Sequence, residues 1–458
     1  MDLKKRFQSI FDEHRENYDY MEIRLERTEN QIIQLKNSDL ENLTSDLEAG
    51  GNVRVLKDGG WSFVVFNDLN DLEEMAEKAV NAAQMVGKSE STLAPIEPVE
   101  DEVLFEPEND PRQVGLTKKI ETLRNYCQII DNYGEPIIMS RIFFGETFTT
   151  LTFANSEGTH IVQEKYDMKG GLIAYASRDG STESDVMGFG SIESVEPIFG
   201  REEEVKQICT NLVELMDAPR IKGGQYTVVL DPEMTGLFTH EAFGHLSEAD
   251  SVSENDSLRE TMKLGRTFGS EELSIYDGAM LGRRGSSKYD DEGVRTEKTY
   301  LIKNGKLVGR LHTRETAGKM DAEPTGNARA ISYKYPPIPR MRTTAIEGGN
   351  HTFEEMIADI DDGIYMVKAK GGKTSGENFS FTSNYGYRIK DGKLDGMVKG
   401  VTLTGNVFQT LEDIDMVADD FEAPNYPWAC GKGQQSGLPC SQGGPHIRVR
   451  NVTIGGDE

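Results

Sequence analysis

The chain has 458 residues, 36% of them hydrophobic, and this length favours two domains with ordinary cores. Asp and Glu number 78 against 50 Lys and Arg, a formal net charge of −28, which disfavours nucleic-acid binding as the main role. No apolar run approaches the roughly 18 residues that span a bilayer, and the charged N-terminus lacks a signal-peptide pattern. Four cysteines are too few for a disulfide scaffold. We therefore expect a cytoplasmic protein that binds neither nucleic acid nor membranes.

The first part of the chain predicts helices and antiparallel strands in alternation. Apolar residues at helical spacing predict a helix over residues 3–11, and residues 20–37 contain two strand-like runs. Residues 51–68 predict a hairpin that turns at residues 58–60. A helix rich in Ala, Glu and Met follows this hairpin and ends at Gly87.

Residues 88–113 contain four prolines and many acidic residues, so an extended linker is predicted there. Three further elements follow: a helix over residues 116–132, strands over 136–180 and a helix over 202–216. Turns are predicted within the strand region at residues 156–158 and 169–171. The order of helix, paired strands, hairpin and helix occurs roughly twice, which leads to the hypothesis of an internal duplication.

The remainder of the chain predicts mostly antiparallel strands. Tyr226–Leu230 has the pattern of a buried strand, and a turn and a helix follow it. Residues 297–312 and 385–405 each predict two strands joined by an Asn-Gly or Asp-Gly turn. This region also carries most of the residues that could perform chemistry.

These patterns predict an α+β fold with a domain boundary near residue 220. Residues 1–220 would form an N-terminal mixed α/β domain of antiparallel strands and flanking helices. Residues 221–458 would form a C-terminal β-rich domain that carries the helix after the buried strand.

That helix contains the segment HEAFGH, residues 240–245, in which two histidines five positions apart flank a glutamate. The common zinc-peptidase motif places the histidines four apart. Residues five apart on an ideal helix are rotated by about 140°, so they do not easily reach one metal ion. An inserted residue, as in a π-bulge, would return both to one face, and Gly244 would tolerate that distortion.

His240 and His245 could then bind Zn²⁺ through their imidazole nitrogens, with Glu241 as the base that takes a proton from water. Zinc lowers the pKa of its bound water to about 7, and a catalytic site needs a third protein ligand and one open position. The alternative hypothesis is that the motif occurs by chance in a helix without metal.

Several residues are candidates for the third ligand. Glu248 and Asp250 lie close by in the sequence, and the Gly-rich residues 428–449 hold Cys430, Cys440 and His446. The neighbouring Lys432 would help to keep the Cys430 thiolate ionised, which places Cys430 modestly ahead of Cys440. The alternative for each cysteine is a small buried apolar residue.

Other chemistries have weaker support. The sequence Gly372-Lys373-Thr374 lacks the spacing of a phosphate-binding loop, and there is no G-x-S-x-G motif. The acidic segment 282–293 does not follow the spacing of a calcium loop and predicts a solvent-exposed turn.

Six segments in the second half resemble the TldD/PmbA metallopeptidases, also called modulators of gyrase, and specifically their metal-bearing TldD-type subunit. They are THEAFGHLSEAD, GRRGSSKYDDEGVRTEKTYLIKNGKLVGRL, TGNARAISYKYPPIPRMRTT, GGKTSGENFSFTSNYGYRIKDGKL, VKGVTLTGNVFQTLEDIDMVADD and ACGKGQQSGLPCSQGGPHIRV. Together they cover most of residues 235–457 in the family's order. The first half matches the family only in its general layout.

The resemblance implies a zinc peptidase that acts on peptides or unfolded polypeptide segments inside the cell. It implies His240, His245 and Cys430 as metal ligands and Glu241 as the general base. It further implies a homodimer, or a heterodimer with a PmbA-type subunit, whose enclosed cavity excludes folded proteins. The chain departs from the family in a longer segment after Cys430 and in Cys440, which could compete for the metal.

Three rival hypotheses make distinct predictions. The HExxGH string also resembles dipeptidyl-peptidase III, but the rest of the chain lacks that family's pattern. A non-catalytic assembly subunit of the PmbA type would have lost the histidines and the glutamate. A binding module with structural zinc would need a fourth protein ligand, for which Cys440 and His446 are the candidates.

Overall fold

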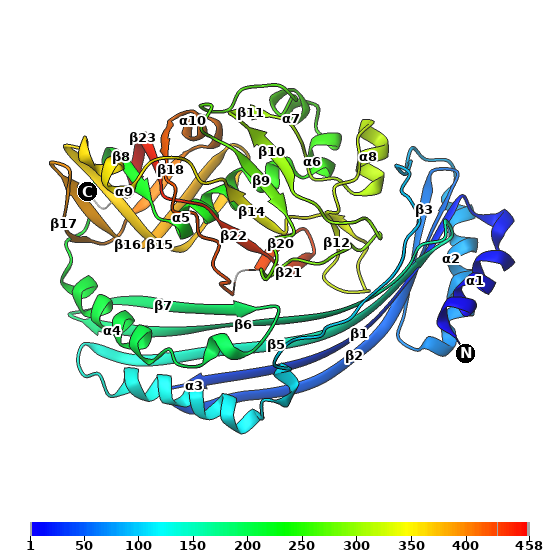
Figure 1. The fold of residues 1–458 in the computed structure, drawn as a ribbon, viewed down its shortest axis with the longest axis horizontal. Helices are drawn as coiled ribbons and strands as arrows, with labels where there is room; N and C mark the ends of the chain where they lie inside the picture. Colours follow the sequence, from blue (N-terminus) through cyan, green and yellow to red (C-terminus); the bar gives the residue numbers. More distant parts are fainter. Residues whose placement is uncertain (1, 428, 456–458) are drawn as a thin grey trace.

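A computed structural model describes residues 2–427 and 429–455. The fold is α+β, as predicted, and Figure 1 shows its two layers. A long curved sheet built by the first part of the chain forms the lower layer, and the strand-rich second part lies over its concave face. No helix in the described part of the chain is long and apolar enough to cross a membrane.

Antiparallel pairing dominates the lower sheet, whose strand order is β3-β2-β1-β5-β6-β4, with β7 also paired to β6. The short β4 runs parallel to β6. The bounds are β1 Tyr20–Lys36, β2 Asp39–Lys57, β3 Gly60–Phe66, β4 Glu100–Val103, β5 Ile137–Asn155, β6 His160–Arg178 and β7 Ser181–Ser191. Four helices accompany these strands: α1 Leu3–Glu13, α2 Leu72–Val86, α3 Leu116–Asp131 and α4 Glu202–Asp217.

The helices α1 to α4 confirm the helical patterns of the sequence, but two strand predictions are wrong. β1 is one continuous strand of 17 residues rather than two runs. Residues 169–171 lie inside β6 instead of forming a turn, and the chain turns at Asp179 and Gly180. A Cβ atom on Gly170 would lie 2.1 Å from the Phe189 ring, so this glycine allows close packing on the neighbouring strand.

The order of one helix, three antiparallel strands and one helix occurs twice, as α1-β1-β2-β3-α2 and α3-β5-β6-β7-α4. The two sets join through β1 and β5, which pair antiparallel from Glu22↔Asn155 to Lys36↔Arg141. A common origin of the two sets stays a hypothesis. The predicted domain boundary, in the segment between α4 and β8, also stays a prediction.

Two larger sheets form the upper layer, in the orders β15-β8-β23-β18-β16-β17 and β11-β10-β9-β14-β22, with β19 also paired to β23. Only the pairs β8–β15 and β14–β22 are parallel among these named strands. The first sheet comprises β8 Gly224–Leu230, β15 Asp362–Ser375, β16 Asn378–Lys390, β17 Lys393–Val398, β18 Thr402–Asn406, β19 Ile414–Val417 and β23 Ile447–Gly455. The second comprises β9 Ile275–Gly278, β10 Thr299–Lys303, β11 Lys306–Leu307, β14 Thr343–Ile346 and β22 Ser441–Gly443.

The main hydrophobic core of this layer includes Phe243 of the HEAFGH segment and Phe238, which lies just before it. Two small two-stranded sheets complete the strands: β12 Ala328–Arg329 with β13 Ile338–Pro339, and β20 Ala429–Lys432 with β21 Gln435–Pro439. The helices are α5 Pro232–Phe238, α6 Ala249–Glu254, α7 Asp256–Thr261, α8 Arg314–Met320, α9 Phe353–Ala358 and α10 Val407–Glu412.

The acidic segment predicted to be a solvent-exposed turn is instead buried between the two layers. Asp291 is 6% exposed and Glu292 is 2% exposed. Asp291 lies 3.2 Å from the Arg24 guanidinium of β1, and Glu292 lies 3.4 Å from that of Arg54 in β2. Because the sheet presents buried arginines, these carboxylates leave water to pair with them, and they join the two layers.

Candidate metal centre

The HEAFGH segment follows β8 through a short helix whose geometry changes at the motif. The Asp231 side chain caps α5 by accepting a hydrogen bond of 2.7 Å from the Met234 backbone N–H. Residues Thr239–Gly244 then form a π-helix, and His245 begins a 3₁₀ turn. This wider turn confirms the predicted π-bulge, which allows histidines five apart to face each other. The imidazole rings of His240 and His245 lie 5.3 Å apart between centroids.

The predicted reason for Gly244 is wrong. Its dihedral angles, φ −56° and ψ −52°, belong to an ordinary right-handed helix, so the π turn itself does not require a glycine. A Cβ atom at this position would lie 2.0 Å from the sulfur of Met341. The glycine is therefore needed because Met341 packs directly against the helix.

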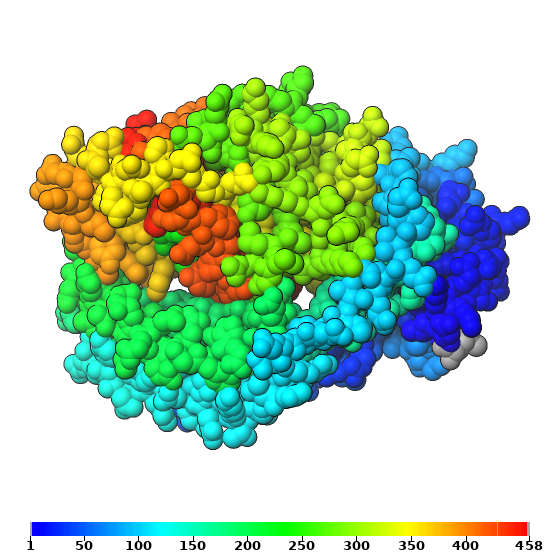
Figure 2. Space-filling view, viewed as in Figure 1, coloured from blue at the N-terminus to red at the C-terminus, as the bar shows by residue number. Residues whose placement is uncertain are grey.

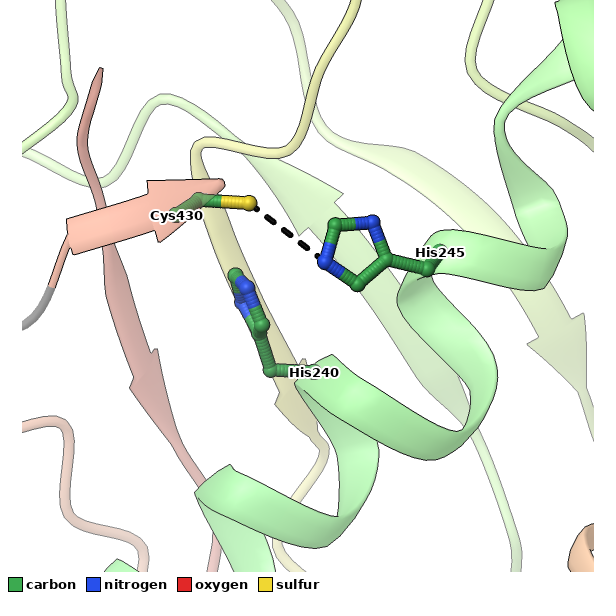
Figure 3. A group of neighbouring side chains, drawn as sticks. All are labelled: His240, His245 and Cys430. Atoms are coloured by element: carbon green, nitrogen blue, oxygen red, sulfur yellow. Dashed lines mark hydrogen bonds between the residues drawn. The ribbon is translucent and has the colours of Figure 1, made fainter. Parts of the chain in front are cut away.

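Cys430 joins the two histidines from the β20–β21 hairpin, as Figure 3 shows. Its Sγ lies 3.5 Å from His245 Nε2, and the candidate ligand atoms of all three residues lie within 4.8 Å of one another. Cys430 is 3% exposed and His240 is 2% exposed. The structure therefore brings together the three residues that the sequence analysis assigned to the metal.

The three residues fit a zinc ion. Two imidazoles and one thiolate are usual zinc ligands, and tetrahedral zinc holds nitrogen and sulfur ligands roughly 3.5 Å apart. His240 Nδ1 is buried and has no hydrogen-bond partner, which a folded protein tolerates poorly unless the ring serves a ligand. Among the residues that the structure describes, this is the only such group of three His, Cys, Asp or Glu side chains.

The charges at the centre favour an ionised cysteine. Burial raises the pKa of the Cys430 thiol, but the hydrogen bonds and charges of His240 and His245 outweigh burial and lower the pKa to about 5. Burial likewise lowers the pKa of His245, but its contacts with Cys430 and Glu248 raise the pKa to about 10. At neutral pH the thiol is therefore a thiolate, the form that binds metal.

Glu248 orients His245 and is not part of the group of three. Its Oε2 lies 3.0 Å from His245 Nδ1 and 3.0 Å from Lys432 Nζ. A carboxylate on the far side of a metal-binding imidazole holds the proton on Nδ1, so that Nε2 is the nitrogen that binds the metal in exchange for its own proton. Lys432 also donates a hydrogen bond of 2.7 Å to Asp250, so Asp250 too is not a ligand.

Lys432 was expected to keep the Cys430 thiolate ionised, but its amine forms ion pairs with Glu248 and Asp250 instead. The sequence analysis missed the orienting role of Glu248, although a carboxylate three residues after His245 was a usable signal. Arg340, whose Nε lies 4.0 Å from Glu248 Oε1, carried no signal because it comes from a distant loop.

The two remaining candidates from the Gly-rich segment have other environments. His446 lies between the Asp420 carboxylate, 2.7 Å from Nδ1, and the Tyr365 hydroxyl, 2.9 Å from Nε2. Cys440 is buried outside the group of three, and burial raises the pKa of its thiol to about 12. Neither residue closes the centre as a fourth ligand, which a structural zinc site would require.

Glu241 follows His240 directly on the π turn, and its side chain is partly exposed. Within residues 2–427 and 429–455 its carboxylate has no hydrogen-bond or ion-pair partner. A carboxylate next to a metal ligand and free of other partners is placed to accept a proton from water.

Glu233, in the first turn of α5, should make the stability of the protein depend on pH. It lines a cavity of 550 Å³ that also borders β7 and β15, and burial together with the Asp231 carboxylate raises its pKa to about 8. The unfolded chain releases this proton near pH 4.5 and the folded chain near pH 8, so rising pH favours unfolding within this window. Between pH 5 and pH 8 the wild type should lose about 3–4 kcal/mol more free energy of unfolding than Glu233→Gln. Urea unfolding at both pH values measures this difference. If the wild type and Glu233→Gln lost the same free energy of unfolding, Glu233 would not be the source of the pH dependence.

Comparisons with known proteins identify the family of the chain. Residues 223–456 match the sequence profile of the PmbA/TldA metallopeptidase C-terminal domain, and residues 21–83 match that of PmbA/TldA metallopeptidase domain 1. A metalloprotease of Synechocystis sp. is 40% identical, and the alignment covers 99% of this chain and 98% of that protein. A zinc metalloprotease TldD homolog of Saccharolobus solfataricus is 27% identical, with coverage of 91% and 92%.

The crystal structure of TldE from Thermococcus kodakarensis has the same fold. It superposes with a TM-score of 0.80 at 18% identity and covers 98% of this chain and 100% of that chain. Two matching profiles and a relative that is 40% identical along nearly the whole chain agree with the resemblance of the six segments. The chain belongs to the PmbA/TldD family of metallopeptidases.

Proposed function

We propose that this protein is a zinc-dependent peptidase that hydrolyses peptides or unfolded polypeptide segments, in peptide maturation or intracellular proteolysis. The observation that carries the proposal is the meeting of His240, His245 and Cys430 within 4.8 Å beside Glu241. Three protein ligands leave a fourth position for water or substrate, as in catalytic zinc sites. The zinc named for the relative from Saccharolobus solfataricus supports the choice of metal.

Each residue of the centre has a task in this proposal. His240, His245 and Cys430 would hold the zinc ion, which when bound supplies Lewis-acid chemistry by polarising a peptide carbonyl and acidifying water. Glu248 keeps the proton on His245 Nδ1, so that Nε2 stays available as a ligand. Glu241 would take the proton from the attacking water and deliver it to the leaving amine nitrogen.

The hairpin that carries Cys430 supports binding of an extended substrate. β20 pairs with β21 only, so its other edge has no strand partner among the described residues. An extended peptide could add a strand at such an edge through backbone hydrogen bonds, a mode that depends little on side chains. This mode suits a peptidase for unfolded segments of varied sequence.

Removal of the metal tests the proposed function. The purified protein should contain about one zinc ion per chain by elemental analysis and should cleave an unstructured peptide. Chelation should abolish cleavage, and stoichiometric zinc should restore it, because three side chains without metal cannot polarise the peptide bond. Cleavage that survives complete removal of zinc, measured on the same sample, would contradict the proposal.

We further propose that the protein acts in the cytoplasm as a dimer with a second copy or with a PmbA-type subunit. β3 pairs with residues 51–57 of β2 and Tyr333 contacts residues 48–50, so residues 39–47 have no strand partner on this edge among the described residues. Leu47 is 58% exposed and Leu43 is 43% exposed on this edge. Proteins seldom leave such an edge uncovered.

Light scattering of the purified protein should give the molar mass of two chains. Leu47→Glu should shift this molar mass towards that of one chain. The molar mass of a single chain at micromolar concentration of the wild type would exclude the homodimer.

A further inference from the structure

A cavity of about 310 Å³ lies between the lower sheet and the upper layer, and part of its wall belongs to the β20–β21 hairpin that carries Cys430. Strands β1, β5 and β6 line one side of it, and residues 437–439 of the β20–β21 hairpin line the other. Leu438, in the cavity wall, is the direct partner of Cys430 in that hairpin. Figure 2 shows gaps along the line where the two layers meet. A substrate bound at the metal centre could therefore reach this cavity.

The wall of the cavity concentrates positive charge in a chain that is otherwise strongly acidic. Five cations line it, together with four carboxylates: Arg24, Lys165, Lys169, Arg329 and Arg342, with Glu26, Glu48, Asp167 and Asp291. The Lys165 amine lies 3.8 Å from the Asp291 carboxylate, and the Arg24 guanidinium lies 3.2 Å from it. Arg329 and Arg342 donate to backbone carbonyl oxygens and form no ion pair with a carboxylate among the described residues.

The other carboxylates of the wall are each paired with a cation. Glu26 is paired with Arg24 at 2.8 Å, so Arg24 adds no free positive charge, and Glu48 is paired with Lys334, which lies outside the wall. Asp167 accepts two hydrogen bonds, of 2.7 and 2.8 Å, from the guanidinium of Arg284. Asp290 is buried behind the wall, where its carboxylate accepts hydrogen bonds from the backbone N–H groups of Glu292, Val294 and Ala328.

Lys165 is the group in this cluster that is best placed to meet a ligand. Its side chain is 33% exposed, and in the described part of the chain its only ion pair with a carboxylate is the long one to Asp291. Buried or half-buried cations that lack their own counter-ion attract an anion, and a small cavity with a few converging polar groups is the usual form of a ligand site.

We propose that this cavity binds a carboxylate of the peptide substrate and that Lys165 contacts it. The inference rests on the proposed peptidase function and narrows the substrate class to peptides with a carboxylate near the scissile bond. A C-terminal α-carboxylate and an Asp or Glu side chain share this chemistry. The cavity would thereby favour particular cleavage positions in a peptide whose backbone is bound without regard to sequence.

The test measures binding and avoids turnover by using the zinc-loaded Glu241→Gln protein. Titration calorimetry compares one unstructured ten-residue peptide in three forms: with a free C-terminus, with a C-terminal amide, and with the amide plus one internal glutamate. At least one carboxylate form should bind about tenfold more tightly than the neutral amide, as a charge-assisted hydrogen bond predicts. The peptide form that binds more tightly than the amide shows whether the cavity binds the C-terminal carboxylate or the glutamate side chain.

Substitution of Lys165 assigns the preference to the cavity. Lys165→Met should remove the tenfold difference, whereas Lys165→Arg should keep most of it because the charge is retained. Lys206→Met, on the outer face of α4, is the matched control and should keep the full difference. Equal affinity for the three peptides in the parent protein would overturn the inference while leaving the peptidase proposal intact. If Lys165→Met still bound the carboxylate peptide more tightly than the amide, the role of Lys165 would be overturned. If none of the three peptides bound the parent protein, the peptidase proposal and this inference would both be contradicted.

Discussion

Replacing Glu241 by Gln should lower kcat for peptide hydrolysis by about 10²–10⁴-fold while the protein keeps its zinc. The glutamine amide has nearly the same shape as the carboxylate but cannot take a proton from water. The metal should stay because the three ligands, His240, His245 and Cys430, are unchanged. Cleavage of an unstructured peptide and zinc content by elemental analysis, both on the same preparation, measure the two expected results.

A matched control separates this effect from a general change of charge. Glu260→Gln removes one carboxylate from the exposed surface of α7 and should leave both kcat and zinc content at the wild-type values. Cleavage by Glu241→Gln at a rate within a few-fold of the wild type would show that another group is the base. Loss of zinc in Glu241→Gln would instead assign Glu241 a role in holding the metal.

Cys430→Ala should weaken zinc binding by more than about 100-fold, because it removes a direct ligand, and even residues behind the ligands contribute 10–100-fold. Cys440→Ala should keep about one zinc ion per chain, because Cys440 lies outside the group of three and its buried thiol is protonated at neutral pH. A zinc indicator in competition with each purified variant measures the dissociation constants.

The comparison of the two cysteine variants also decides between ligand sets. Circular dichroism should show that both variants are folded, so that loss of metal is not loss of structure. Zinc loss in Cys440→Ala with zinc retained in Cys430→Ala would exchange their roles. Weaker binding in both variants to the same degree would indicate a closed site with four ligands and would favour a structural metal.

The secondary structure could be predicted well wherever the pattern is local. The π turn followed from the five-residue spacing of His240 and His245, because one metal ion can be reached from both only if the helix widens. The turn predicted at residues 169–171 is wrong because two adjacent glycines are as compatible with a tightly packed strand as with a chain reversal. Gly170 instead accommodates the Phe189 ring of the next strand, a contact that no local pattern contains.

The metal ligands were accessible from the sequence, but their surroundings were not. The residue types alone place Cys430 only modestly ahead of Cys440 as a ligand. The family resemblance is what selects Cys430. The exposed turn predicted for residues 282–293 is wrong because its acids pair with arginines more than 200 positions earlier in the chain. Local composition cannot distinguish a solvated acid from one whose counter-ion arrives through the fold.

The pairing of Asp291 with Arg24 and of Glu292 with Arg54 has a consequence for how this protein is made. A ribosome releases the strands that carry both arginines long before it releases the two acids. Until then each arginine has only its partner within the sheet, Glu26 for Arg24 and Glu22 for Arg54, and the concave face that the upper layer later covers stays in contact with water. A transcript cut short before residue 290 would leave a half-finished product with an uncovered surface, the kind that chaperones and quality-control proteases recognise.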